Sequence, residues 1–117
     1  MAATPVPALP VLPDVVTRYL AAHDARDAGA ALVTMHEDAT VTDDGSTYAG
    51  AAAIGRWLGT AASEYTYTTQ LLAAEREDDA HYAVTNRLEG NFPGGRVDLR
   101  FRFTLRDGLI EDLTIAP

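Results

Sequence analysis

Three side chains in the first half of the sequence carry groups that could move a proton. Tyr19 and His23 are four residues apart, so on a helix the phenol and the imidazole share one face. Asp43 ends the β-branched run Ala-Thr-Val-Thr-Asp, and an apolar surround at that strand end would raise the pKa of its carboxyl toward the range of a general base. Structural readings stay open: Asp43 as a turn residue, Tyr19 as a core aromatic and His23 as a half-buried helix residue.

Aromatic side chains further along the chain could line a binding cavity beside these groups. Trp57, the only tryptophan, lies within an apolar helical stripe, where it either fills the core or forms a wall for a flat apolar ligand. Tyr67 alternates with Tyr65 along a predicted strand and could face the same cavity, although cross-strand packing accounts for it equally. Phe101 and Phe103 share one face of a later strand and are candidate ligand contacts.

Asn86 interrupts a strand face that otherwise calls for hydrocarbon. The other members of its row are Tyr82, Val84 and Leu88. A buried amide needs hydrogen-bond partners, so on an inward face Asn86 would orient a ligand or a catalytic water. If the strand is rotated, Arg87 and Glu89 face inward and Asn86 belongs to an interface. The apolar and aromatic neighbours favour the inward arrangement.

Helical periodicity in the first half predicts the elements that position Tyr19, His23 and Trp57. Apolar residues at helical spacing predict helices over 15–25 and 51–62. Between them Asp27 can cap a second, shorter helix that ends near His36, and Asp14 is the candidate N-cap of the first. A strand over 39–43 then turns through Asp-Gly-Ser into a short hairpin strand.

From residue 64 onward the period changes to two and predicts four long strands. Their cores are 65–69, 81–88, 97–105 and 109–115, and short turns between them require antiparallel neighbours. The strand over 97–105 is apolar on one face and charged on the other. A sheet with one apolar face needs a cover. The sequence therefore predicts an α+β fold in which a curved sheet wraps three helices and leaves a conical cavity where the strands outreach them.

Length and composition bound the domain organisation. The chain has 117 residues, enough for one domain with a real core, which we assign to 14–117. Residues 1–13 hold four of the six prolines and are expected to form a flexible N-terminal arm. No apolar run of about 20 residues and no signal-peptide start is present, so we expect a soluble, cytoplasmic protein.

Several functional classes are excluded on the same grounds. The net charge of -8 opposes binding to nucleic acid and to anionic membranes, which are held through Lys and Arg. The absence of cysteine removes thiol chemistry and cysteine-ligated zinc. His23, His36 and His81 show no spacing that presents metal ligands together, and no phosphate loop or GxSxG elbow occurs. We predict neither a metal nor a cofactor.

Four local patterns occur in an order and spacing that cover nearly the whole chain from Asp14. They are Arg18-Tyr19 followed by Asp24 and Asp27, Asp38 to Asp43, Tyr48-Ala-Gly50 leading to Ile54 and Trp57, and Phe103 to Ile110. Together they resemble the NTF2-like superfamily, and within it the SnoaL-like polyketide cyclases and the ketosteroid isomerases. The resemblance implies an NTF2-like (cystatin-like) cone, mostly antiparallel, enclosing a pocket. Tyr19 then resembles the isomerase oxyanion-hole phenol and Asp43 the proton-shuttling base, while Phe101 stands where the isomerases have a second donor.

The resemblance implies a small enzyme that binds a hydrophobic cyclic or polyketide-like molecule and moves a proton, with Asp43 as base and Tyr19 and His23 as donors. The alternative is a non-catalytic binding or association module of the same fold. A third reading is an epoxide hydrolase, because Arg87-x-Glu89 echoes its Arg-x-Asp pair, although Ile115 stands at the later Asp position. Similar proteins suggest a homodimer formed through the outer sheet face.

Overall fold

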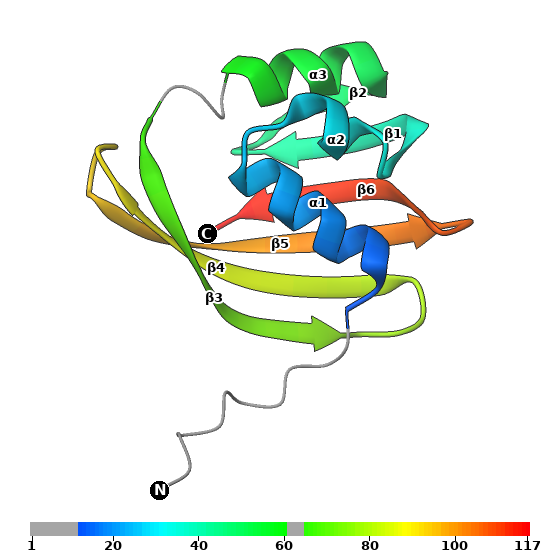
Figure 1. Ribbon diagram of the computed structural model, residues 1–117. Coiled ribbons are helices and arrows are strands. Elements are labelled where there is room, and N and C mark those ends of the chain that lie inside the picture. The colour runs from blue at the N-terminus through cyan, green and yellow to red at the C-terminus, as the bar shows by residue number, and fades with distance from the viewer. Residues whose placement is uncertain (1–11, 61–64) are drawn as a thin grey trace, which may run out of the picture.

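The computed structural model describes residues 12–60 and 65–117, and within these ranges the chain forms three helices and six strands (Figure 1). The elements are α1 (Asp14–Asp24), α2 (Ala28–Leu32), β1 (Met35–Asp43), β2 (Ser46–Ala49), α3 (Gly50–Thr60), β3 (Tyr67–Arg76), β4 (His81–Gly90), β5 (Arg96–Arg106) and β6 (Leu109–Ala116). The expected arm over 1–13 lies almost entirely outside the described residues, as does the predicted end of the third helix at residue 62. None of the described helices is long and apolar enough to span a membrane.

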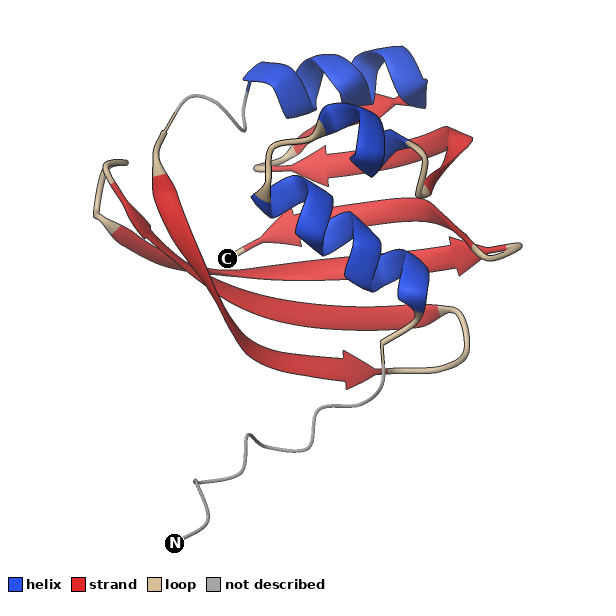
Figure 2. Ribbon diagram, viewed as in Figure 1, coloured by secondary structure: helices blue, strands red, loops and turns tan. Residues whose placement is uncertain are grey.

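All the strands belong to one sheet with the order β2-β1-β6-β5-β4-β3. β1 runs parallel to β6, and every other neighbouring pair is antiparallel, which confirms the predicted meander from β3 to β6. Register shifts interrupt the pairing of β3 with β4 and of β5 with β6. Such irregularities bend strands and increase their twist. The helices pack on the concave face of the curved sheet, as the α+β cone requires (Figure 2).

Helix α1 begins one residue earlier than the capping pattern predicts. Asp14 is the first helical residue and makes no side-chain cap; Pro13 precedes the helix in an extended conformation, and its carbonyl accepts from the backbone N–H groups of Val16 and Thr17. Proline suits this position because its missing N–H would be unsatisfied in any case. Asp14 instead forms an ion pair with Arg18, 2.9 Å away, so the predicted N-cap role was wrong.

Helix α2 is much shorter than predicted. Asp27 caps it as expected, since its carboxylate accepts from the backbone N–H of Ala30 at 3.0 Å. The helix ends at Leu32 and not near His36, because Thr34 donates its hydroxyl proton to the Ala31 carbonyl and accepts a backbone bond from Ile110 in β6. The chain therefore joins the sheet at Met35, and His36 lies on β1, where its side chain bonds the Arg106 carbonyl at 2.6 Å.

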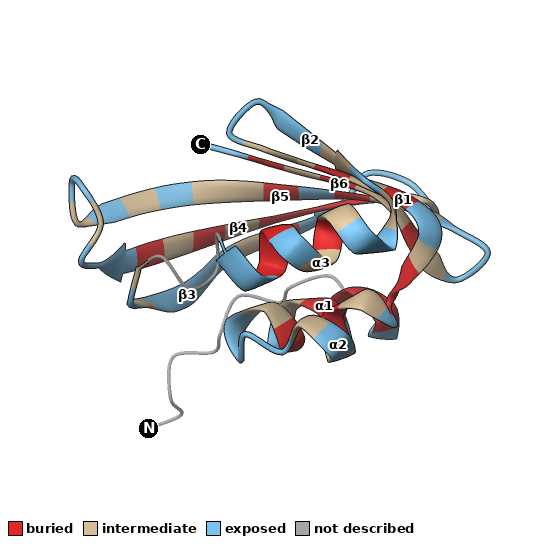
Figure 3. Ribbon diagram, turned by 90° about the horizontal axis from the view of Figure 1, so that it is seen from above, coloured by how far each residue is buried: buried red, intermediate tan, exposed pale blue. Residues whose placement is uncertain are grey.

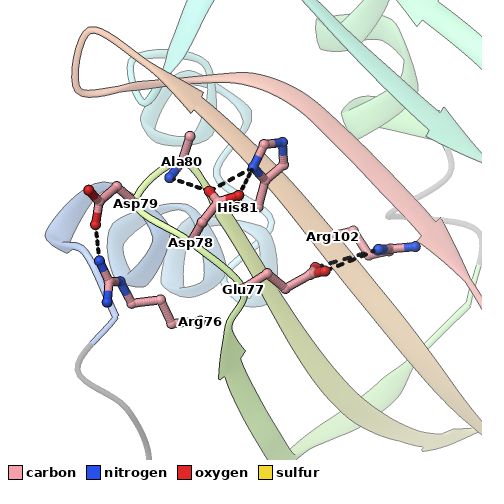
Figure 4. A network of polar contacts seen from close by, with 7 residues as sticks. All are labelled: Arg76, Glu77, Asp78, Asp79, Ala80, His81 and Arg102. Atoms are coloured by element: carbon pink, nitrogen blue, oxygen red, sulfur yellow. Dashed lines mark hydrogen bonds and ion pairs between the residues drawn. The ribbon is translucent and has the colours of Figure 1, made fainter.

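The turn between β3 and β4 is held by a dense polar network (Figure 4). Asp78 accepts from the backbone N–H of Ala80 and from Nδ1 of His81, both at 2.8 Å. The bond from His81 holds the pKa of the Asp78 carboxyl below its usual range, and the Ala80 bond adds to this. Arg102 on β5 contacts Glu77 at 3.5 Å, which ties β5 to the end of β3 on the outer face. This network joins the β3–β4 turn to β5.

The core lies between the helices and the concave sheet face (Figure 3). Its largest fully buried side chains are Tyr19, Phe103, Ile54, Ile110, Leu113, Val16, Val41, Val84 and Thr34. The inward row of β4 is Tyr82, Val84, Asn86 and Leu88, all buried, so the inward arrangement of Asn86 is confirmed. Arg87 lies on the opposite face, where its Nε donates to Asp98 at 2.8 Å. The arginine of the epoxide-hydrolase pattern therefore does not face the core.

A substitution at Gly90 tests how closely the start of β3 packs on β4. A Cβ at Gly90 would overlap the Thr66 carbonyl oxygen and lie 2.7 Å from the Cα of Tyr67. We expect Gly90→Ala to lower the free energy of unfolding by about 2 kcal/mol, because backbone atoms cannot move aside as a flexible side chain does. Urea unfolding of the variant measures the loss.

Gly59→Ala is the matched control. No atom lies within 4 Å of a Cβ built on Gly59 in helix α3. Alanine there should raise the free energy of unfolding by up to about 1 kcal/mol through helix propensity. Equal stability of the two variants would show that the close approach at Gly90 is absent in solution.

Candidate functional site

Two adjoining cavities open on the concave face among the described residues. The larger, about 450 Å³, lies between α1 and the strands β3 to β5, and the smaller, about 370 Å³, lies over the ends of β1, β5 and β6. Both are lined by His23, Tyr67, Leu88 and Phe101, which form their common wall. The remaining lining of the larger cavity is Leu12, Thr17, Leu20, Ala21, Asp24, Thr69, Leu71 and Asn86. The remaining lining of the smaller is Asp43, Asp44, Tyr65, Phe92, Pro93, Val97, Leu99 and Ile115.

Asp43 stands at the end of β1, where the strand reaches the smaller cavity. Its Oδ2 accepts a hydrogen bond from Trp57 Nε1 at 3.0 Å. Burial raises the pKa of the Asp43 carboxyl, and the bond from Trp57 opposes that rise by stabilising the charged form. The neighbouring Asp44 carries a negative charge that raises the Asp43 pKa further. The carboxyl is therefore both oriented and made more basic than an exposed aspartate.

Trp57 supports this carboxylate from within the core. Its side chain is 4% exposed and lines neither of the two cavities. The indole stacks on Tyr48 with ring centroids 6.0 Å apart, and it lies 5.8 Å from the ring of His23. Of the two roles considered from the sequence, core filling describes Trp57 better than a cavity wall, with an additional role in orienting Asp43.

Tyr19 and His23 form a hydrogen-bonded pair on α1. The Tyr19 hydroxyl lies 2.9 Å from His23 Nδ1, and the tyrosine is fully buried. Burial raises the pKa of Tyr19 far above its usual range, so the phenol keeps its proton. Burial also lowers the pKa of His23 to about 4, so the imidazole is neutral near pH 7. No other acceptor for the Tyr19 hydroxyl occurs among the described residues, so the hydroxyl donates to Nδ1, and the His23 proton resides on Nε2.

This assignment reverses the expected order of the two side chains. Tyr19 packs against Phe103, with ring centroids 5.7 Å apart, and lines neither of the two cavities. His23 lines both cavities and packs edge-on against Phe101 at 5.6 Å. The imidazole is thus the group placed to meet a ligand, and Tyr19 fixes its tautomer. Phe103 belongs to the core beneath this pair.

The remaining expected contacts, Tyr67, Asn86 and Phe101, all line the larger cavity. Burial raises the pKa of Tyr67, which also borders the smaller cavity. Sequence reasoning missed Arg26, whose guanidinium lies 5.3 Å from the Tyr67 ring centroid and donates to the Tyr65 carbonyl at 2.7 Å. The one sequence signal for Arg26 was its position in the polar segment 24–27, between the first two predicted helices. Arg26 therefore joins the α1–α2 turn to the segment leading into β3.

No group of three or more His, Asp or Glu residues within 12–60 and 65–117 is arranged to hold a metal ion. The groups available for chemistry in the two cavities are a carboxyl, a neutral imidazole and an amide, surrounded by aromatic side chains. Apolar surroundings lower the local dielectric, which strengthens hydrogen bonds relative to those in water.

Comparison with known proteins places this arrangement in a family. Residues 16–113 match the SnoaL-like domain. The chain belongs to the SnoaL-like family. A search of curated proteins found no match. Among solved structures, the chain is similar to a putative polyketide cyclase from Sinorhizobium meliloti, with 35% identity over 90% of this chain and 95% of that one and a TM-score of 0.83.

Two more distant structures show the same fold. One is a Catenulispora acidiphila protein with a ketosteroid isomerase-like fold in complex with trimethylamine, at 19% identity over 92% of this chain and 87% of that one, with a TM-score of 0.79. The other is a Mycobacterium tuberculosis protein in complex with estradiol-17beta-hemisuccinate, at 20% identity over 88% and 90%, with a TM-score of 0.73. The NTF2-like cone of this SnoaL-like protein is thereby confirmed.

The neutral state of His23 predicts a specific pH dependence of stability. Because its folded-state pKa of about 4 is below the unfolded value of 6.5, the stabilisation is complete above pH 6.5 and is lost as the pH falls through about 4. The loss should reach about 3 kcal/mol in the free energy of unfolding, from 1.36 kcal/mol for each unit of difference in pKa. Urea unfolding between pH 4 and 7.5 measures it.

His23→Gln is the matched variant for this measurement. Glutamine offers Tyr19 an acceptor oxygen and does not titrate, so the difference between the two profiles isolates the imidazole from Asp43 and the surface carboxyls. We expect the wild type to lose stability relative to the variant as the pH falls. Parallel profiles would contradict a buried neutral His23.

Proposed function

We propose that this SnoaL-like protein is a small enzyme that binds a hydrophobic cyclic or polyketide-like molecule and moves a proton within it. The observation that carries the proposal is Asp43, a partly buried carboxyl of raised pKa that lines the same cavity as the neutral imidazole of His23. A base and a hydrogen-bond donor on one apolar cavity are what enolisation of a ketone requires. The similarity to a putative polyketide cyclase supports the substrate class.

The reaction follows from the positions of these groups. The Asp43 carboxylate takes a proton from a carbon next to a carbonyl, and the electron pair of that C–H bond forms the enolate. His23 Nε2–H donates a hydrogen bond to the enolate oxygen, where the negative charge develops. The protonated Asp43 then returns the proton to another carbon of the same molecule, so no co-reactant is consumed. Trp57 holds the carboxyl between these steps through its 3.0 Å bond.

His23 takes the place that the resemblance gives to Tyr19. Tyr19 acts through His23 and is a positioning residue, because its hydroxyl donates its hydrogen bond to His23 Nδ1 and its side chain is fully buried. Phe101 offers only hydrocarbon where the isomerases have a second donor, and it lines both cavities. The proposed site therefore stabilises an enolate with one side-chain donor and an aromatic surround.

The second candidate function is a binding module without catalysis. It is favoured by Phe101, since loss of the second donor weakens enolate stabilisation while leaving a well-formed apolar cavity. The two functions differ in one readout. A binding module retains affinity for apolar ligands but exchanges no protons with them.

Substitution of Asp43 tests the proposed base. We expect Asp43→Asn to slow solvent deuterium exchange, at the carbon next to the carbonyl of a panel of cyclic ketones, by about 10²–10⁴-fold, which is the usual contribution of a general base. Proton NMR in heavy water measures the exchange. Wild-type exchange at the buffer rate across the panel would instead establish the binding module.

Trp57→Phe tests how the base is tuned. The indole bond lowers the Asp43 pKa, so its removal should raise that pKa and move the acid limb of the rate profile to higher pH. Carbon-detected NMR titration of the Asp43 carboxyl gives the same shift without any substrate. Tyr48→Phe is the control, because Tyr48 stacks on Trp57 but makes no bond to Asp43 in the described structure. An unchanged Asp43 pKa in Trp57→Phe would contradict this tuning.

We also propose that two copies associate through the outer face of the sheet. No helix covers this face in the described part of the chain, yet Ala83 on it is only 2% exposed, beneath long charged side chains. Arg100 pairs with Glu75 at 3.3 Å and Arg87 with Asp98 at 2.8 Å, so both signs of charge occur side by side on this face. Arg100 Nε is buried without a hydrogen-bond partner. A face that carries charges of both signs can be self-complementary across a two-fold axis.

A charge placed in the centre of this face tests the dimer. Thr85 lies opposite Arg100 in the β4–β5 register, so Thr85→Arg adds a cation beside an existing one. We expect size-exclusion chromatography with light scattering to give a dimer for the wild type and a monomer for Thr85→Arg. Gly59→Arg, at an exposed position of helix α3, is the control and should remain dimeric. A wild-type monomer at micromolar concentration would refute the proposal.

A further inference from the structure

Asn86 is the buried polar side chain that the proposed proton transfer does not use. It is 5% exposed, lies on the floor of the larger cavity, and makes no hydrogen bond to any other described residue. Its register partners on the neighbouring strands are Leu71 and Leu99, neither of which offers a side-chain donor or acceptor. Buried amides in folded proteins are almost always hydrogen-bonded. The amide atoms of Asn86 are reached from the cavity, since Arg100 Nε is the one fully buried side-chain nitrogen or oxygen without a partner among the described residues. A ligand group that enters the cavity can therefore complete the hydrogen bonds of this amide.

The surroundings of Asn86 define the rest of that ligand. Most of the larger cavity is hydrocarbon, contributed by Leu12, Leu20, Leu71, Leu88 and Phe101. Leu71 is 44% exposed, which is high for a leucine on the concave side of a sheet. An apolar body lying over these side chains would remove that surface from water. The cavity thus suits a molecule that is apolar along its length and polar where it meets the amide.

The charges around both cavities select against an anionic ligand. Among the described lining residues, Asp24, Asp43 and Asp44 carry carboxyls and none is Lys or Arg. The sequence also places no Lys or Arg at 1–11 or 61–64. His23 is neutral, because burial lowers its pKa to about 4. A carboxylate brought into either cavity would meet three carboxyls and no lining cation, because the nearby Arg26 is not a lining residue and its guanidinium donates to the Tyr65 carbonyl. The group that meets Asn86 is therefore uncharged, such as a hydroxyl or a carbonyl.

The order of strands in the sheet sets the length of a ligand that could contact both Asp43 and Asn86. Asp43 lies on β1 and Asn86 on β4, with β6 and β5 between them. The register places Asp43 level with Val84, two residues before Asn86. Three strand spacings across the sheet and about 7 Å along it separate the two backbones by roughly 16 Å, and inward-pointing side chains on a concave face shorten the gap to the order of 10 Å. The shared wall of His23, Tyr67, Leu88 and Phe101 lies between the two ends.

We propose that the larger cavity is a second subsite, in which Asn86 binds the uncharged polar end of an elongated apolar ligand that reaches across to Asp43. The subsite rests on the proposed function only in placing the reacting end of the ligand beside Asp43. The amide both donates and accepts, so it serves a hydroxyl or a carbonyl at the far end. Asn86 is thus a specificity-determining residue for molecules with two polar ends.

Equilibrium binding of matched biphenyls to the full chain tests the subsite. The probes are 4,4′-dihydroxybiphenyl, which has two uncharged polar ends, 4-hydroxybiphenyl, which has one, and 4′-hydroxybiphenyl-4-carboxylate. We expect the first to bind about 3- to 10-fold more tightly than the second, as one added hydrogen bond gives, and the carboxylate to bind most weakly. Quenching of the single tryptophan or calorimetry gives the affinities.

Asn86→Leu should abolish the preference for the dihydroxy probe while leaving the affinity for 4-hydroxybiphenyl unchanged or higher. Gln70→Leu is the matched control, because it makes the same amide-to-leucine change at an exposed position on β3, outside both cavities, and it should keep the preference. If Asn86→Leu does not fold, the side-chain amide signals of Asn86 in the wild type decide. They should shift with the dihydroxy probe and not with 4-hydroxybiphenyl.

Equal affinities of the two neutral probes for the wild type would overturn the subsite, as would a preference that survives Asn86→Leu or amide signals that do not respond. These readouts do not depend on turnover. Loss of the preference with proton exchange intact would refute the subsite alone, whereas a preserved preference with no exchange in any ketone would refute only the proposed catalysis.

Discussion

The contact between helix α1 and strand β5 sets both the core and the cavity. Two successive ring pairs form along it: Tyr19 meets Phe103, and one helical turn later His23 meets Phe101. The helix ends at Asp24, whereas β5 continues away from it through Leu99 and Val97, which line the smaller cavity. The first pair is sealed and the second lies at the edge of the opening. The cavity exists because the strand outruns the helix that covers it, and the bends of the sheet keep that uncovered stretch concave.

Burial at this edge brings the protonation equilibria of the site groups into a useful range. It lowers the pKa of His23 and raises that of Asp43, so both depart from their ordinary values in the direction of the neutral form. The Asp43 carboxyl, which is more basic than usual, suits the role of proton acceptor. The His23 imidazole, which stays uncharged, suits the role of hydrogen-bond donor. The same burial directs the Tyr19 O–H bond toward His23 Nδ1 as a hydrogen-bond donor, because a fully enclosed hydroxyl has no water to which it can donate. The packing of α1 against the sheet therefore determines the protonation states of the site residues.

Much of the architecture could be predicted because it depends on local patterns. The alternation along 97–105 specified which face of β5 is apolar, and the inward row around Asn86 followed from the same rule on β4. The end of α2 could not be predicted, because it depends on the backbone bond from Ile110 to Thr34, more than seventy residues away in the chain. The predicted helix continued to near His36, but Met35 and His36 are the first two residues of β1.

By itself, the sequence determined that Tyr19 and His23 share a helix face, that Asp43 ends a strand, and that a one-faced sheet must wrap the helices, because these follow from residue periodicity and burial. Only the tertiary structure decided which of the paired side chains meets the cavity. His23 does so and Tyr19 does not, since the sheet closes over one turn of α1 and opens at the next. The bond from Trp57 to Asp43 was likewise decided by packing, which brings α3 across the end of β1. The spacing of residues along the chain determines which face of a helix or strand each side chain occupies. How deeply a side chain is buried depends on where neighbouring helices and strands end relative to one another.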